Sequence, residues 1–174
     1  MNKAALRVKH KDLRLSVDPV LSEAASFRLQ EKAWEILKDL NCVGIYISMD
    51  HEVSTRKLLK RCFDAHKIVC VPKIIDRQMV FIQIKDLSQC QLSAYGILEP
   101  VSSKPYLGKI EIQIIPMLAF NQRKYRLGYG KGYYDAYLKN YQGMKCGLCF
   151  SWDKEDDLIE SENDIACDEI FTEL

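Results

Sequence analysis

The sequence predicts an α/β fold of three layers, in which a largely parallel, Rossmann-like sheet is flanked by helices. Short apolar runs rich in β-branched residues alternate with segments whose apolar residues recur at helical spacing. That order is typical of a parallel sheet with crossover helices. The chain has 174 residues, of which 48% are hydrophobic. We therefore expect one domain spanning residues 1–174, large enough to bury a core of its own.

The N-terminal quarter of the chain is expected to be helical. Lys3–Leu15 carries mixed charge, and the run Val17-Asp18-Pro19 should end this first helix. Pro19 and Ser22 suit the start of a second helix, because proline fits the first helical turn. Apolar residues then recur three or four apart, which predicts an amphipathic helix packed on the body of the domain: Ala25, Leu29, Ala33, Ile36 and Leu40.

Strands and helices alternate along the rest of the chain. Ser54 is expected to cap a helix that buries Leu58, Leu59, Cys62 and Phe63. A short helix is predicted over Tyr133–Tyr141, and a loop passes through Gly96, Pro100 and Pro105. Apolar runs predict strands at Cys42–Ser48, Lys67–Val71 (closed by Pro72), Met79–Ile84, Ile110–Ile115, Lys145–Phe150 and Glu169–Thr172. Because parallel sheets bind ligands beyond the carboxyl ends of their strands, the loops after Ser48 and Ile115 are candidate sites.

Composition and charge indicate a soluble cytoplasmic protein. The net charge of +1 disfavours a dedicated nucleic-acid binder. Met1–Arg14 is too charged for a secretory signal, and the apolar stretch Ile114–Phe120 is too short to span a membrane. Seven cysteines, an odd number mostly inside apolar runs, indicate reduced buried thiols. Cys146 and Cys149 form an isolated C-x-x-C in a strand, so we expect them on opposite faces, in the core.

The segment Arg126–Asp135 carries the strongest chemical signal. Its sequence, RLGYGKGYYD, has glycines at alternate positions just before the predicted helix. Glycine adopts positive φ without penalty, and free N–H groups at a helix start attract phosphate. Arg126 and Lys131 add cationic donors, and Asp135 could hold a Mg²⁺ ion that arrives with the phosphates. These residues predict a site for a nucleotide triphosphate.

The spacing of this segment excludes two common nucleotide loops. A Walker A loop needs Ser or Thr after Gly-Lys, where this chain has Gly132. A dinucleotide fingerprint needs Gly at position 133, which is Tyr133. Two other interpretations remain open: a flexible turn before a helix, and an RNA-stacking surface formed by Tyr129, Tyr133 and Tyr134.

The run RLGYGKGYYDAYL, preceded by IPMLAF, closely resembles the signature of the 5-formyltetrahydrofolate cyclo-ligase (methenyltetrahydrofolate synthetase) family. Weaker matches lie along nearly the whole chain. They are the basic pair Lys3 and Arg7, the loop Ser48–Thr55, the turn Tyr95–Pro100, and the closing segments Asn163–Asp164 and Asp168–Ile170.

The resemblance implies an ATP-dependent cyclo-ligase that converts 5-formyltetrahydrofolate to 5,10-methenyltetrahydrofolate, with Mg²⁺ as cofactor and ADP and phosphate as products. It implies that Lys131 and Arg126 act on the transferred phosphate and that Asp135 and Asp164 bind the metal. The implied ATP contacts are Lys3, Arg7, Arg126, Leu127, Gly128, Tyr129, Gly130, Lys131, Gly132, Tyr133 and Tyr134. The implied folate contacts are Ile47, Glu52, Tyr129, Gly130, Lys131, Gly132 and Tyr133.

Glu52 suits two roles in such an enzyme: recognition of the amino-lactam edge of a pterin, or deprotonation of N10. No role is assigned to the histidines, and His10 and His66 are expected at the surface. We expect a monomer whose partners are ATP and the folate. Two alternatives stay open, a phosphotransferase acting on another small aromatic acceptor and a non-catalytic RNA-binding module.

Overall fold

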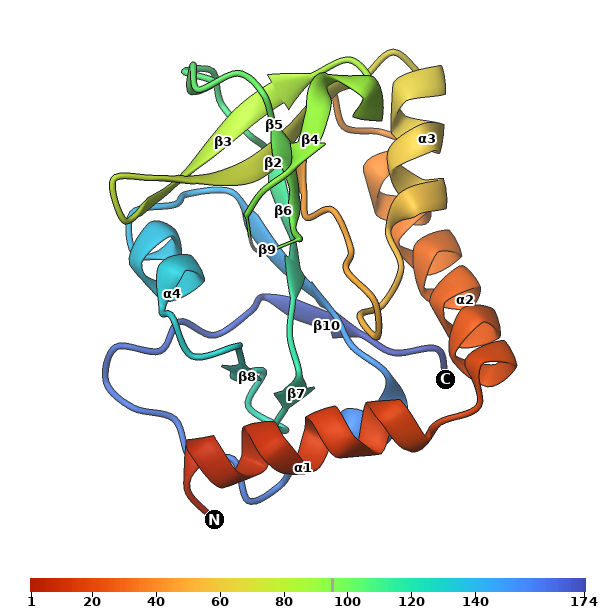
Figure 1. The fold of residues 1–174 in the computed structure, drawn as a ribbon, viewed down its shortest axis with the longest axis vertical. Helices are drawn as coiled ribbons and strands as arrows, with labels where there is room; N and C mark the ends of the chain where they lie inside the picture. Colours follow the sequence, from red (N-terminus) through yellow and green to blue (C-terminus); the bar gives the residue numbers. More distant parts are fainter. Residues whose placement is uncertain (95) are drawn as a thin grey trace.

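A six-stranded sheet forms the centre of the computed structural model, which describes residues 1–94 and 96–174 (Figure 1). The strand order is β10-β9-β6-β1-β2-β3, and each neighbouring pair is parallel except the hairpin β2–β3. The bounds are β1 Cys42–Ile45, β2 Ile68–Ile75, β3 Gln78–Ile84, β6 Ile112–Pro116, β9 Met144–Leu148 and β10 Glu169–Phe171. The predicted α/β class with a largely parallel sheet is confirmed.

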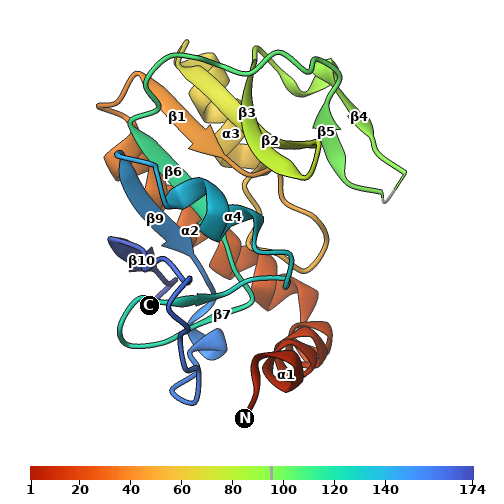
Figure 2. The ribbon, with the colours of Figure 1, turned by 90° about the vertical axis from the view of Figure 1, so that its left-hand side faces the viewer.

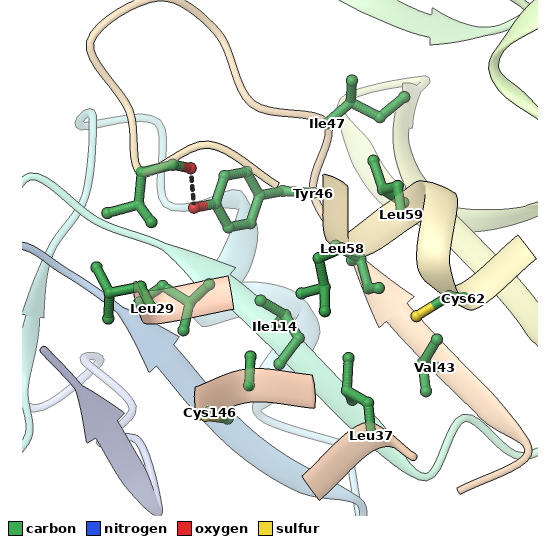
Figure 3. Close-up of a cluster of buried hydrophobic side chains, with 14 of the residues drawn as sticks. Leu29, Leu37, Val43, Tyr46, Ile47, Leu58, Leu59, Cys62, Ile114 and Cys146 are labelled. Carbon is green, nitrogen blue, oxygen red and sulfur yellow. Dashed lines mark hydrogen bonds between the residues drawn. The ribbon is translucent and has the colours of Figure 1, made fainter. Parts of the chain in front are cut away.

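Helices cover both faces of this sheet. Helices α2 (Pro19–Leu37) and α3 (Arg56–Asp64) lie on one face and α4 (Tyr133–Leu138) on the other (Figures 1 and 2). Leu29 and Leu37 of α2 pack with α3 and the central strands in the main core cluster (Figure 3). On the opposite face the ring of Tyr137 lies 4.8 Å from that of Phe81. The three layers follow from these two separate apolar faces.

Helix α1 (Lys3–Ser16) does not cover a face of the sheet. It crosses beneath a two-stranded sheet formed by β7 (Ala119–Phe120) and β8 (Arg126–Leu127), as Figure 1 shows. Leu6 packs there in a separate cluster with residues of the chain that follows β6 and with Leu127. This helix therefore lies across the end of the molecule where β6 and β9 finish, with the glycine-rich segment beside it.

Local details differ from the sequence expectations. Pro72 does not close β2, which continues to Ile75 and pairs Pro72 with Phe81 of β3. The proline is tolerated because β1 pairs with β2 only as far as Cys70, so this part of β2 has a neighbour on one side. The N-cap of α3 is Thr55 rather than Ser54, and the Thr55 hydroxyl donates to the Tyr46 carbonyl instead of capping the helix.

The segment expected to be a loop contains more regular structure. It includes a 3-10 turn, Leu87–Gln89, and a hairpin of β4 (Cys90–Leu92) and β5 (Leu98–Pro100). Tyr95, the first residue of the family-like turn, lies outside the described residues. A second 3-10 turn, Ser151–Asp153, follows β9. Strands this short carry too few residues for an alternating pattern to stand out in the sequence.

The described cysteines are free, and six of the seven are buried. Cys146 packs in the main core cluster and Cys149 in the cluster on the α4 side. The expectation that this pair points to opposite faces is confirmed. Among the described residues, no helix combines the length and the apolar character that crossing a membrane would require.

Candidate active site

The glycine-rich segment links β8 to α4. Arg126 and Leu127 pair with β7, and the chain then turns through Gly130 with φ +103° and Gly132 with φ +71°. Both values lie in the region that side chains with a Cβ rarely adopt. Gly132 is the N-cap of α4 and has no side chain to bond the first helical turn. The N–H groups at the start of α4 are therefore available to a ligand.

Arg7 of α1 lies directly against this turn. Its Nε donates to the Gly128 carbonyl at 2.8 Å. A Cβ at Gly130 would stand 3.2 Å from Cζ of Arg7, closer than most real Cβ contacts. Gly130 is thus required both by its backbone conformation and by the approach of the guanidinium. Lys3 and Arg7, four residues apart, share one face of the helix: Arg7 contacts the glycine-rich segment, and Lys3 contacts Ser161 and Asp164.

The two aspartates expected to bind metal lie in adjoining segments. Asp164 forms an ion pair with Lys3, and Asp135 forms one with Arg126 at 2.7 Å. Asp135 also accepts the Ile165 N–H at 3.0 Å, which ties it to the residue after Asp164. Burial raises the pKa of Asp164, but the Lys3 ammonium and the hydrogen bonds from Ser161 together hold it below its ordinary value.

The donor set in this corner fits a magnesium ion that arrives with a nucleotide. Among residues 1–94 and 96–174, no group of three or more His, Cys, Asp or Glu side chains forms a metal cage. Mg²⁺ normally uses one or two protein carboxylates together with substrate phosphates and water. Asp135 and Asp164 supply two carboxylates beside a phosphate-type turn. The sequence-based assignment of these two residues remains a prediction.

Glu52 lies on the loop that follows β1. The loop is held closed by paired bonds between Ser48 and Thr55, each 3.2 Å long, and by the Tyr46 hydroxyl, which donates to the Val53 carbonyl at 2.6 Å (dashed in Figure 3). Within it the Glu52 carboxylate accepts the Met49 N–H at 2.8 Å. These bonds fix the carboxylate on a short, rigid loop at the carboxyl end of a central strand.

Glu52 faces the glycine-rich segment through Tyr129. Burial raises the pKa of Glu52, and this rise is opposed by the Met49 N–H, by the Tyr129 hydroxyl and by the charge of Arg14. Burial and the nearby Glu52 charge in turn raise the pKa of the Tyr129 hydroxyl far above its ordinary value. The carboxylate is thus partly desolvated and within reach of a ring that a flat ligand could stack on.

The other predicted site residues differ in their exposure to solvent. Lys131 is exposed, and no ion pair in the described part of the chain involves it. Tyr133 is half-buried, and the Tyr134 hydroxyl is buried with no hydrogen-bond partner. Leu127 and Ile47 are core side chains, so Leu127 can contribute only its backbone. Ile47 belongs to the main core cluster drawn in Figure 3. Their ligand contacts remain predictions.

A buried polar network beside the site was not foreseen. His10, expected at the surface, is 1% exposed: its Nδ1 lies 2.8 Å from Asp153 and its Nε2 lies 3.0 Å from Glu155. Arg14 is buried next to it and bonds to Asp153 at 2.8 Å. Leu6, His10 and Arg14 are each four residues from the next and so share one face of α1, which the structure shows to be buried. The expectation of a surface His66 agrees with the structure, where it is exposed.

Comparison with known proteins assigns the chain to a family. Residues 1–173 match the model of the 5-formyltetrahydrofolate cyclo-ligase family. The chain belongs to that family. The prediction of an enzyme of the ligase class is thereby confirmed. A 5-formyltetrahydrofolate cyclo-ligase of Haemophilus influenzae is 23% identical over 95% of both chains. The cyclo-ligase of Mycoplasma pneumoniae is 28% identical over 92% of both chains.

Solved structures support the cyclo-ligase fold. The 5,10-methenyltetrahydrofolate synthetase of Aquifex aeolicus is 29% identical and superposes with a TM-score of 0.82, covering 99% of this chain and 90% of that one. The synthetase of Mycoplasma pneumoniae is 24% identical with a TM-score of 0.79 and full coverage of both chains. At that identity the second match supports the fold alone.

Proposed function

We propose that this cyclo-ligase uses ATP and Mg²⁺ to convert 5-formyltetrahydrofolate to 5,10-methenyltetrahydrofolate, releasing ADP and phosphate. The observation that carries the proposal is the meeting of three elements. Arg7 of α1 lies against the glycine turn, Asp135 and Asp164 adjoin that turn, and Glu52 faces it from the loop after β1. Family membership supplies the identity of the folate.

The distribution of charge around the glycines supports ATP binding, which is the nucleotide half of the proposed site. Arg7 bonds only a carbonyl oxygen here, and Lys131 has no carboxylate partner among the described residues, so both cations are uncommitted to an ion pair. A triphosphate along the turn would accept from these two side chains and from the N–H groups at the start of α4. Lys3 and Arg126, now paired with aspartates, would border the same anion.

Asp135 and Asp164 are the residues that would hold the magnesium ion. When bound, the ion would neutralise charge on the phosphates. In the structure these two carboxylates pair with Lys3 and Arg126, which leaves the positive charges of Arg7 and Lys131 for the phosphates.

The reaction requires that the two substrates be oriented correctly, and it needs no nucleophile from the protein. The formyl oxygen on N5 is a poor leaving group, so the γ-phosphoryl group is transferred to it and ADP leaves. N10 then attacks the activated carbon, its proton is lost, and the C–O bond breaks as phosphate departs. Such steps depend on orientation and charge neutralisation. Glu52 would either bind the donors of the pterin edge or accept the N10 proton, and both roles need its ionised form.

We further infer that residues 1–174 act as one domain, as a monomer in the cytoplasm. Support comes from the single central sheet, which joins segments from all parts of the chain, and from the free buried thiols, which suit a reducing compartment. Sedimentation of purified protein would check the monomer, and a concentration-dependent mass would contradict it.

The decisive assay incubates purified protein with Mg-ATP and 5-formyltetrahydrofolate and follows the near-ultraviolet absorbance of the methenyl product. ADP should appear in equal amount. If ADP is released with another aromatic acceptor and no methenyl absorbance appears, the protein is a phosphotransferase that acts on that acceptor. Tight, salt-sensitive RNA binding without ATP turnover would indicate a binding module instead. Folded protein that gives no product would contradict the proposal.

A further inference from the structure

Arg14 is a buried cation that the proposed reaction does not use. Its side chain is 3% exposed, although burying a guanidinium is costly unless its donors are satisfied. Here they are. Nε donates to Asp153 at 2.8 Å, Nη1 to the His51 carbonyl at 3.2 Å, and Nη2 to the Met117 and Leu118 carbonyls at 2.6 and 3.2 Å.

The partners of Arg14 come from three different loops. His51 follows β1, Met117 and Leu118 follow β6, and Asp153 follows β9. These three strands lie side by side in the sheet, and their loops form the end on which the site is built. One planar side chain with donors in fixed directions therefore sets the positions of three loops relative to one another.

The guanidinium is itself held in place by a network of buried polar side chains. The second oxygen of Asp153 lies 2.8 Å from His10, whose other ring nitrogen lies 3.0 Å from Glu155. Arg14 also lies over the ring of Phe150, with Cζ 5.5 Å from the ring centre. His10 and Arg14, which both lie on α1, are thereby fixed to the segment after β9.

Arg14 is close to the folate side of the site rather than to the nucleotide side. With Lys11, His51, Leu118 and Tyr129 it lines a pocket of ≈ 220 Å³. His51, which accepts from Arg14, is bonded in sequence to Glu52. The charge of Arg14 also lowers the pKa of both Glu52 and Tyr129 against the effect of burial. Arg7, on the nucleotide side, lies two turns earlier on α1.

We infer that Arg14 is a positioning residue for the folate half of the site, which holds the Glu52 loop at a set distance from Tyr129 and the glycine-rich segment. This inference rests on the proposed function. A residue that merely anchored α1 would act equally on both substrates, because α1 also carries Lys3 and Arg7. A residue that positions the Glu52 loop acts mainly on the folate.

The test compares Arg14→Met and Arg14→Lys with Arg28→Met, which removes an exposed arginine of α2. In Arg14→Met we expect the KM for 5-formyltetrahydrofolate to rise about tenfold or more, because small displacements of positioning groups are costly, while the KM for ATP changes less than about threefold. Arg14→Lys keeps the charge but loses the planar guanidinium with its several N–H donors, so the KM for 5-formyltetrahydrofolate should rise by an intermediate factor. Equal increases in both KM values, or an unchanged folate KM, would overturn the inference.

Hydrogen–deuterium exchange provides a readout that does not depend on turnover. Amides of residues 48–55 should exchange faster in both Arg14 variants than in the wild type, while those of residues 126–135 keep their rates. Unchanged exchange in the 48–55 loop would contradict the inference even if activity fell. Should Arg14→Met fail to fold, Arg14→Lys carries the same two measurements. A wild-type protein without ring-closing activity refutes the proposed function, and the exchange experiment still decides whether Arg14 holds the loop.

Discussion

The guanidinium of Arg7 lies against Gly130, where even a Cβ would require it to shift by a few tenths of an ångström. A Cβ at this position would stand 3.2 Å from Cζ and 3.3 Å from Nε of Arg7. The backbone there has φ +103°. Two independent constraints, one on conformation and one on contact, therefore converge on a single residue of the proposed nucleotide site.

Gly130→Ala should weaken ATP use about tenfold or more. The new methyl group would shift the Arg7 guanidinium by a few tenths of an ångström, and the left-handed backbone conformation would add roughly 1–2 kcal/mol of strain. The KM for ATP in the ring-closing assay measures the effect. Gly96→Ala is the matched control: its φ of +71° imposes comparable strain, but nothing lies within 4 Å of the new Cβ. It should lose stability and keep the wild-type KM for ATP, and an equal KM change in both variants would contradict the role of Arg7.

Lys131→Ala should lower kcat/KM for ATP roughly 10- to 100-fold. The side chain has no competing carboxylate in the described structure, so its loss removes a charge-assisted phosphate contact worth about 1.5–3 kcal/mol. Steady-state kinetics at varied Mg-ATP measure this. Lys139→Ala, which removes an exposed lysine just after α4, serves as control and should leave the kinetics unchanged. Kinetics of Lys131→Ala equal to those of the control would remove this lysine from the site.

Glu52→Gln should lower the rate at low folate by about tenfold or more and abolish the acidic limb of the pH profile. Either proposed role needs the carboxylate, and burial raises its pKa, so wild-type activity should fall as pH drops through a value above the ordinary 4.5. Because the folded pKa is raised, the ionised carboxylate costs stability above that value, and the variant should be at least as stable at pH 7. Glu23→Gln, at an exposed position of α2, is the control. An acidic limb that persists in Glu52→Gln would assign the titration to another group.

Glu155→Gln should destabilise the fold by about 1 kcal/mol or more at pH 7, since it removes the carboxylate charge that pairs with Lys9 and lies 3.0 Å from a ring nitrogen of His10. The bond from Lys9 and that from His10 lower the pKa of Glu155 from the ordinary 4.5 to about 2. A lowered folded pKa stabilises the fold above 4.5, and this contribution is lost as pH falls toward 2. Urea unfolding at several pH values should show the wild type and variant converging in that range. A constant difference, or the same loss in the exposed-site control Glu162→Gln, would show that the ionisation of Glu155 is not the cause.

The sequence was sufficient for the layers of the fold, and it singled out the glycine-rich segment that is proposed here to bind the nucleotide. Apolar periodicity is a local property, so the helix beginning at Lys3 and the strand beginning at Cys42 could be recognised without tertiary information. The strands of two or three residues around Leu92 and Phe120 could not, because their pairing partners, and not their composition, make them strands. Pro72 was misinterpreted for a related reason, since whether a proline ends a strand depends on which neighbours the strand has.

The polar network of α1 was missed because its residues are ordinary when considered singly. His10 and Arg14 look like members of a charged helix face until Asp153 and Glu155 are brought to them from 139 to 145 residues away. Such contacts join parts of the chain that no local pattern relates. The family-like signature drew attention to Lys3 and Arg7 instead, which face the same end of the molecule from neighbouring positions on the helix.

The placement of α1 also has a consequence for how the chain is made. Lys3 contacts Asp164, 161 residues further on, and His10 and Arg14 contact residues of the 3-10 turn after β9 and its neighbour Glu155. Contacts of such long sequence separation form slowly, and during synthesis they must wait for the later segment to leave the ribosome. The helix made earliest is therefore among the last to dock, and until it does the glycine turn lacks Arg7. If the turn binds nucleotide as proposed, a nascent chain cannot do so before almost all of it has been translated.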